Sequence, residues 1–329
     1  MNRKGDVYLT RKEVVLKTIK FQTPERLAYD LYGDYGSDIY LRWLDPPADG
    51  VFSNITDEWG VVWKNIGGSH IGQPVEHPIN DWKDLANLKI PDVTERHRWQ
   101  HYEDLESKAG DRFSCIWGIS MFERVKSLRG IENAWTDPIL YPDELRHLLN
   151  ILVDMNIKQI AICKEYGIDG YFIGDDWGLQ ERLFLSPATF REFWLPCYAR
   201  VFKEAHDAGM VTLMHSCGYI VEIMDDLIDA GLDVINMDQQ ENMGLELLGK
   251  RFGGRITFYC PVDIQKTMNS SLDDIRAYCR KMIKHLWRPE GGFIAKWYTD
   301  PKGAGHSQEA LNVMCEEFLK INEEIYGKQ

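Results

Sequence analysis

Short runs of β-prone residues that end in polar residues recur along the chain. Each run is nearly continuous in apolar character, as expected for strands of a parallel sheet that is covered on both faces. Polar residues follow at once and mark the end of the buried segment. The pattern predicts strands within residues 26–34, 112–120, 169–178, 210–218, 232–240, 255–263 and 291–300.

Between these runs, apolar residues recur at spacings of three and four, which is the period of an amphipathic helix. The segment from 186 to 209 also begins with Ser186, a residue that caps helices, and with Pro187, which suits the first helical position. The pattern predicts helices at 141–167, 186–209, 218–231, 271–287 and 307–327.

The alternation of strand and helix predicts a parallel sheet with crossover helices. Since no glycine-rich dinucleotide fingerprint follows any predicted strand, we expect a closed (β/α)8 barrel, a TIM barrel, rather than an open doubly wound sheet. Residues 52–92, called the excursion below, break the alternation. They predict a β-hairpin and a short helix that cover one mouth of the barrel. We expect residues 1–329 to form one domain.

In a parallel barrel the catalytic groups collect at the carboxyl ends of the strands. The run VTLMHSCG ends there with His215 and Cys217, which share one face of an extended strand. An imidazole nitrogen and a thiolate suit zinc, so the sequence predicts a zinc site. Cys260 is the expected third ligand, with Asp176 and Asp238 as oxygen alternatives. Equally, His215 can be a hydrogen-bonded structural residue and Cys217 a small buried apolar one.

Other polar residues also follow predicted strands. Asp175 and Asp176 are adjacent, and adjacent strand residues face opposite ways, so one of the two is expected to enter the pocket. Together with Asp238 and Lys296 they are candidate catalytic residues that handle a proton or orient the substrate. The structural alternatives are a helix cap or a barrel ion pair for the acids, and an ion-pair partner for the lysine.

Aromatic and amide side chains at the strand ends are candidates for binding an organic substrate. The candidate substrate-binding residues are Trp177, Gln180, Gln240, Trp297 and Tyr298. Four cationic or titratable residues lie in predicted loops or helix faces. We expect His306, Arg124, Lys126 and Arg129 to be solvated.

Composition excludes some classes of partner. The formal net charge is -13 over 329 residues, which argues against nucleic acid or an anionic membrane as the main partner. No run of about 18 apolar residues and no signal-like N-terminal segment occurs, so we expect a cytoplasmic protein with its seven cysteines as thiols.

Several stretches resemble the uroporphyrinogen decarboxylase superfamily. They include TPERLAYDLYGD near the start, GDDWGLQERLFLSPATFREFWLPCY at 174–198, MHSCGYIVEIMDDLIDAGLDVIN at 214–236 and the closing GGFIAKW. The resemblance covers nearly the whole chain and implies a (β/α)8 barrel. It also implies one of two activities: decarboxylation of tetrapyrrole acetates, or methyl transfer that depends on a corrinoid.

The resemblance favours the methyltransferase branch. There a histidine-x-cysteine such as His215 and Cys217 binds zinc with a later cysteine, but the matching region GGFIAKWYTDPKG contains no cysteine here. The decarboxylases have an arginine-rich N-terminal segment that holds the substrate carboxylates, whereas residues 24–36 contain one arginine. We therefore expect decarboxylation of uroporphyrinogen not to be the activity.

The expected function is zinc-assisted transfer of a methyl group between a small methoxylated or thiol substrate and a corrinoid-binding partner protein. The first alternative is a lyase or decarboxylase that uses no corrinoid and acts on a small carboxylate or a tetrapyrrole, with Lys296 binding the acid and an aspartate handling the proton. The second is a non-catalytic protein that binds a tetrapyrrole or a corrinoid partner.

Overall fold

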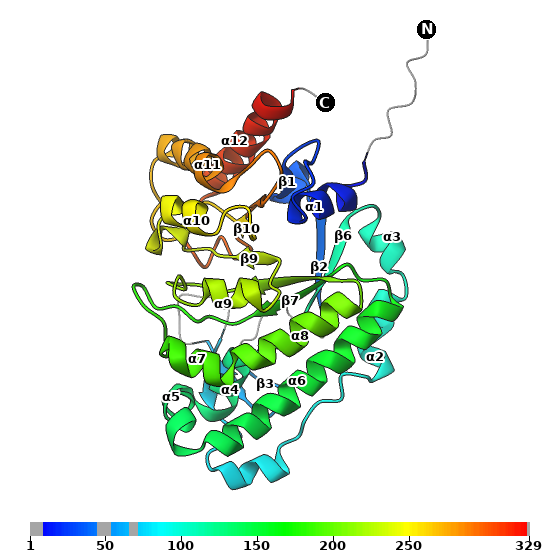
Figure 1. Cartoon of the computed structure of the whole chain (residues 1–329), viewed down its shortest axis with the longest axis vertical. Coiled ribbons are helices and arrows are strands. Elements are labelled where there is room, and N and C mark those ends of the chain that lie inside the picture. The colour runs from blue at the N-terminus through cyan, green and yellow to red at the C-terminus, as the bar shows by residue number, and fades with distance from the viewer. Residues whose placement is uncertain (1–8, 45–53, 66–71, 328–329) are drawn as a thin grey trace.

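The computed structural model describes residues 9–44, 54–65 and 72–327. Its centre is a parallel sheet of eight strands in the order β1-β11-β10-β9-β8-β7-β6-β2, which curls into a nearly closed barrel surrounded by helices (Figure 1). The predicted (β/α)8 barrel is confirmed. The strands are β1 (Ala28–Asp30), β2 (Ile39–Trp43), β6 (Phe113–Trp117), β7 (Gly170–Gly174), β8 (Val211–His215), β9 (Val234–Asn236), β10 (Thr257–Cys260) and β11 (Phe293–Lys296).

From β2 onward, helices fill the connections between successive strands, so that each of these neighbouring parallel pairs is joined by a crossover. Before the barrel comes α1 (Arg11–Ile19), and β2 leads through the excursion to α2 (Arg96–Trp99) and α3 (Leu105–Ala109). The remaining helices are α4 (Phe122–Arg129), α5 (Ile131–Leu140), α6 (Pro142–Glu165), α7 (Pro187–Phe193), α8 (Leu195–Asp207), α9 (Met224–Asp229), α10 (Leu245–Arg251), α11 (Leu272–Leu286) and α12 (Gln308–Tyr326). Among the described residues, none of these helices has both the length and the apolar character needed to span a membrane.

The predicted elements are found with three differences. The helix predicted at 218–231 is the shorter α9 (Met224–Asp229). Strand β2 was not predicted. Its residues IYLRW end in the exposed side chains of Arg42 and Trp43, so its apolar run is short. The predicted helix at 186–209 is two helices that meet at Trp194. The predicted cap is confirmed, since the Ser186 hydroxyl accepts a hydrogen bond from the Thr189 amide at 3.1 Å.

Strand residues alternate between two apolar layers. Phe113, Phe172, Leu213 and Tyr259 belong to the cluster that fills the barrel, together with Val14 and Val15 of α1. Helix α1 lies at the amino ends of the strands, where the Gly292 amide before β11 donates to the Thr18 carbonyl at 2.9 Å. The alternate residues, among them Phe258 and Cys260, belong to the larger cluster that includes the surrounding helices. Helix α1 therefore closes the amino end of the barrel.

The excursion contains a small antiparallel sheet of β3 (Ile55–Thr56), β4 (Val62–Lys64) and β5 (Gln73–Glu76). A short 3-10 helix at Trp82–Asn87 follows, capped by Asp81. The predicted hairpin and short helix are confirmed, with one additional strand; residues 52–53 and 66–71 lie outside the described part. The buried ion pair between Arg129 and Asp137 fastens the end of the excursion to α4 and α5, because Arg129 Nη1 also donates to the Ile79 carbonyl at 2.8 Å.

Candidate functional site

A cavity of about 1060 Å³ lies at the carboxyl ends of β6, β7 and β8. Its floor includes Trp117, Gly174 and His215 at the ends of these strands. Its other wall comes from the excursion and includes Trp59 and Trp63. The excursion therefore covers the carboxyl mouth of the barrel, as predicted, and forms one wall of the space where a substrate can bind.

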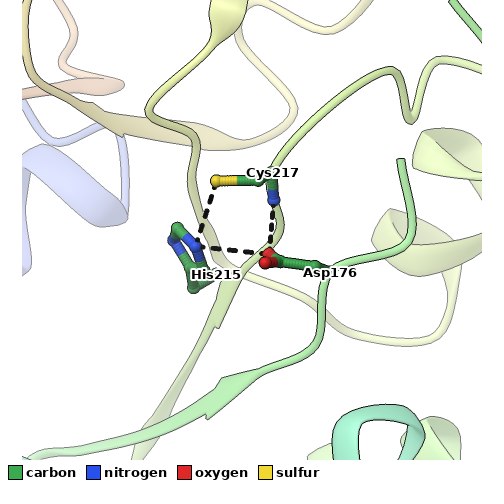
Figure 2. A group of neighbouring side chains, drawn as sticks. All are labelled: Asp176, His215 and Cys217. Atoms are coloured by element: carbon green, nitrogen blue, oxygen red, sulfur yellow. Dashed lines mark hydrogen bonds and ion pairs between the residues drawn. The ribbon is translucent and has the colours of Figure 1, made fainter. Parts of the chain in front are cut away.

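Three side chains on the cavity wall bring nitrogen, sulfur and oxygen atoms together. Asp176 follows β7, His215 ends β8, and Cys217 lies two residues later (Figure 2). His215 Nε2 lies 3.4 Å from Cys217 Sγ and 3.4 Å from Asp176 Oδ1. The Cys217 amide donates to the same Asp176 oxygen at 2.8 Å, which holds the carboxylate in place. Among the described residues, this is the one group of three acidic, histidine or cysteine side chains that is arranged to hold a metal ion.

The hydrogen bonds of Asn236 orient the His215 ring. Asn236 Nδ2 donates to the Tyr259 carbonyl at 2.7 Å and to Asp238 Oδ1 at 3.2 Å. The amide oxygen of Asn236 must then be the atom that lies 2.7 Å from His215 Nδ1, and it can only accept. Nδ1 therefore carries a hydrogen, and the lone pair of a neutral imidazole is on Nε2, toward Cys217 and Asp176. This is the usual outer arrangement of a metal-binding histidine.

The side chains of the group shift one another's pKa values. Burial alone lowers the pKa of His215, but the neighbouring Cys217 and Asp176 more than offset it, so the pKa is raised well above its usual value. Burial acts to raise the pKa of Asp176, yet His215 and the Cys217 amide lower it overall. Burial raises the pKa of Cys217 despite the nearby imidazole. In the metal-free protein a proton on His215 thus supplies the positive charge that balances this acidic group.

The predicted third ligand, Cys260, is not part of this group. It is fully buried in the outer apolar cluster, and burial raises the pKa of its thiol to about 12. The reason is the alternation along β10, where Tyr259 faces the barrel interior and Cys260 faces the helices. Of the two predicted oxygen alternatives, Asp176 is in the group, and Asp238 is linked to His215 through Asn236.

Asp175 and Trp177 face away from the cavity, so their predicted places are wrong. Asp175 is fully buried and accepts hydrogen bonds from the amides of Met121 and Glu123, at 2.9 and 2.7 Å, at the start of α4. Burial raises the pKa of Asp175 to about 7. Trp177 is fully buried and stacks on Phe122, with ring centroids 4.1 Å apart. As predicted from the alternation of strand residues, Asp176 alone of the adjacent pair lines the cavity.

Of the remaining candidates, Gln180 is among the residues that line the cavity. Gln240 is fully buried and donates to the Pro261 carbonyl at 2.7 Å. Trp297 packs edge-on against Tyr32, and Tyr298 against His306. None of Gln240, Trp297 and Tyr298 is among the described lining residues.

Lys296 is 6% exposed, forms an ion pair with Asp238 Oδ1 at 3.2 Å, and is not among the described lining residues of the cavity. His306 is 7% exposed, and Arg129 is buried beside Asp137, so the expectation that they are solvated is wrong. Catalytic roles for all these side chains stay predictions.

Sequence reasoning missed several lining residues. Trp117 was inside a predicted strand, but its stacking on Trp43, with centroids 5.3 Å apart, depends on the unpredicted β2. Gln239 lines the cavity and accepts from the Gly218 amide at 3.1 Å. Sequence reasoning also missed Asn236, which orients His215. Its position at the end of β9, two residues before Asp238, could have indicated it. Glu123 and Lys126 line the cavity from α4, which no strand-end pattern points to.

A family model described as "Uroporphyrinogen decarboxylase (URO-D)" matches residues 68–297. The chain belongs to the uroporphyrinogen decarboxylase family. Among the curated members, the uroporphyrinogen decarboxylase of Xanthomonas axonopodis is 29% identical over 157 residues, which is 46% of this chain and 42% of that protein.

The curated relatives are matched over less than half their length. The uroporphyrinogen decarboxylase of Nocardia farcinica is 33% identical over 97 residues, which is 30% of this chain and 26% of that protein. A solved structure, a methyltransferase from Methanosarcina mazei, superposes with a TM-score of 0.70 over 95% of this chain and 99% of that one, at 15% identity. This likeness shows that the two chains share the fold.

Proposed function

We propose that this member of the uroporphyrinogen decarboxylase family is a zinc-assisted methyltransferase. It moves a methyl group between a small methoxylated or thiol substrate and a corrinoid carried by a partner protein. The observation that carries the proposal is the convergence of Asp176, His215 and Cys217 on the wall of the cavity. Three different donor atoms that lie within metal-binding reach of one another suit metal-assisted chemistry.

The donor set fits zinc in an open site. Catalytic zinc is commonly held by three protein ligands of the nitrogen, sulfur and oxygen type, with a fourth position left for the substrate. Asp176, His215 and Cys217 would be the three ligands, and the orientation of His215 by Asn236 supports this because it leaves Nε2 available. A zinc ion bound there supplies Lewis acidity, which stabilises negative charge on a departing oxygen or on a thiol sulfur.

The side chains around the site bind and orient the substrate. Trp117 and Phe184 provide apolar walls, and Gln239 provides a polar edge. The excursion forms the opposite wall through Trp59 and Trp63. With a methyl ether as donor, a reduced corrinoid held by the partner would supply the electron pair that accepts the methyl group as the C–O bond breaks. The ether oxygen would keep the bonding pair and take a proton.

The solved methyltransferase of the same fold supports this reading by its name. Decarboxylation remains the second candidate, because the curated relatives are named uroporphyrinogen decarboxylases. Two contacts weigh against it. Arg26, the one arginine of the N-terminal segment, is held by both oxygens of buried Asp38 at 2.7 and 2.6 Å. Lys296, the expected carboxylate binder, is paired with Asp238. Neither is among the described lining residues of the cavity.

Zinc content tests the proposal. We expect about one zinc ion per chain in wild-type protein prepared with zinc present, measured by elemental analysis. Cys217→Ser and Asp176→Asn should lose most of it, whereas Cys260→Ser should keep it, because Cys260 faces the helices. Wild-type protein that retains no zinc, or a loss caused by Cys260→Ser alone, would overturn the metal site.

Activity distinguishes the two candidate functions. Methyl transfer is followed by the spectral change of reduced cobalamin, offered free in place of the partner protein, on addition of 2-methoxyphenol. Carbon dioxide release from uroporphyrinogen is measured in parallel. Carbon dioxide release without cobalamin methylation would reject the methyltransferase and establish the decarboxylase.

A further inference from the structure

The charged side chains that line the cavity are paired. Arg124 Nη1 lies 3.2 Å from Asp57 Oδ2, which binds it to the excursion. Lys126 Nζ lies 2.5 Å from Glu123 Oε1 on the same helix. A third cation, Arg98, is bound by Glu58, with Nη2 and Oε2 2.6 Å apart. Thus three cations of the described lining face three carboxylates.

The other ionisable groups of the described lining are His77 and the metal-binding group. His77 Nδ1 lies 2.8 Å from the Ser127 carbonyl oxygen. A divalent ion bound by the Asp176 carboxylate, the Cys217 thiolate and a neutral His215 would leave that group with no net charge. Each lysine and arginine of the described lining thus has a carboxylate partner, and none of them is left over for an anionic substrate.

The walls of the cavity are aromatic. Trp43 and Trp117 stack in parallel, with centroids 5.3 Å apart and planes 3° apart. Phe184 lines the other side, and Lys126 Nζ lies 4.9 Å from its ring centroid. Flat rings favour flat, apolar substrates through stacking and burial. The cavity volume of about 1060 Å³ is at the upper end of the usual range for small-molecule sites, and it leaves room for such a substrate beside the metal-binding group.

We propose that the cavity selects an uncharged aromatic methyl ether and rejects its carboxylated counterpart. This rests on the proposed methyltransferase function and specifies its substrate class. The ether oxygen would take the open position of the zinc, so a carboxylate on the ring would lie elsewhere in the cavity. There it loses its water and meets lysine and arginine side chains that are already paired, so its desolvation is not repaid. An uncharged methoxylated ring loses little hydration and gains stacking on Trp117.

Glu123→Gln provides the sharpest test, because it releases a cation without filling or emptying the cavity. Glu123 has a side chain that is 37% exposed, and glutamine keeps its size. Lys126, whose side chain is only 16% exposed, would lose its carboxylate partner beside Phe184. An anionic substrate would then find an unpaired charge. Glu192→Gln is the matched control, because it breaks the exposed pair with Arg146, which is not among the described lining residues.

The experiment is isothermal titration of the zinc-supplemented protein with 2-methoxyphenol and with 4-hydroxy-3-methoxybenzoate at pH 7. We expect the wild type and Glu192→Gln to bind the uncharged compound at least about tenfold more tightly, which corresponds to roughly 1.4 kcal/mol. In Glu123→Gln the gap should shrink to about threefold or less, through tighter binding of the benzoate. Thermal unfolding of each variant establishes that it is folded.

Three results would overturn the inference: equal or tighter binding of the benzoate by the wild type, an unchanged gap in Glu123→Gln, or no binding of either compound. Because the titration needs neither turnover nor a corrinoid, it separates the two proposals. A preference for the uncharged compound in a protein that does not methylate cobalamin would leave the substrate class standing and reject the methyltransferase.

Discussion

Replacing Asp137 by alanine should destabilise the protein severely. Its carboxylate accepts from Arg129 Nε at 2.8 Å and from Arg129 Nη2 at 2.9 Å, and the two side chains are 1% and 3% exposed. Trp82 Nε1 donates to the same carboxylate at 3.2 Å, and the Trp82 ring lies 4.5 Å from the guanidinium carbon. One buried ion pair thus joins the excursion to α4 and α5.

The magnitude follows from the charge that Asp137→Ala leaves behind. Arg129 would keep its bonds to the carbonyls of Ile79 and Asn80, but two of its donors would stay buried without a partner. Removing one partner of a buried ion pair costs about 3–5 kcal/mol. For a protein of this size, about 2 °C of melting temperature is lost per kcal/mol, so the expected fall is roughly 6–10 °C.

Urea unfolding followed by circular dichroism measures the change. Asp143→Ala is the control, because Asp143 is 95% exposed and its loss should change the free energy of unfolding by no more than about 0.5 kcal/mol. The double variant Arg129→Met/Asp137→Leu removes both charges and should recover part of the stability. A cost below about 1 kcal/mol for Asp137→Ala, or a double variant no more stable than the single one, would refute the reasoning.

Three smaller changes test other contacts. Asn236→Ala should weaken zinc binding by about 10- to 100-fold in a chelator competition, because it frees the ring of His215 to rotate; a change below about threefold would contradict this. His206→Gln should lower the melting temperature more at pH 6 than at pH 8.5. The hydrogen bond of His206 to Asp233 raises its pKa, so this stabilisation is complete below the unfolded pKa and is lost as pH rises through the folded one. Since His206 is 40% exposed, the effect should stay under about 1 kcal/mol, and equal losses at both pH values would refute it. Ser186→Ala should cost about 1 kcal/mol of unfolding free energy through the lost cap of α7, and no loss would mean that water replaces the hydroxyl.

The barrel could be predicted from the sequence because buried parallel strands are nearly continuous in apolar character and stop at polar residues. This pattern predicts the edge of the sheet at which a residue lies. It does not predict whether the side chain points into the barrel or toward the surrounding helices. Cys260 was predicted in the metal site for this reason, although it points outward. Alternation from a known interior residue would have corrected it, since Tyr259 points inward. Counting every second residue from Phe172, which points inward, places Asp176 in the cavity and Asp175 outside it.

The ion pairs that set the charge of the cavity could not be predicted. Arg124 and Asp57 are 67 positions apart, and their contact depends on how the excursion folds over the mouth. A row of cations on a predicted helix is usually a solvated face, and no local pattern distinguishes a buried member. Arg129 is buried in an ion pair with Asp137, which lies on the next helix, α5.

The barrel closes between strands from opposite ends of the chain. Strand β1 pairs with β11, where Ala28 lies opposite Ile294, while on its other side a single bridge from Asp30 to Ser37 takes the place of a ladder with β2. The order of folding follows from this. Bringing such distant segments together has a large entropic cost, so contacts within neighbouring strand–helix units should form before β1 docks. While a chain is being synthesised, β1 lacks the strand β11 with which it pairs. The barrel can therefore close only after the last strand has been synthesised.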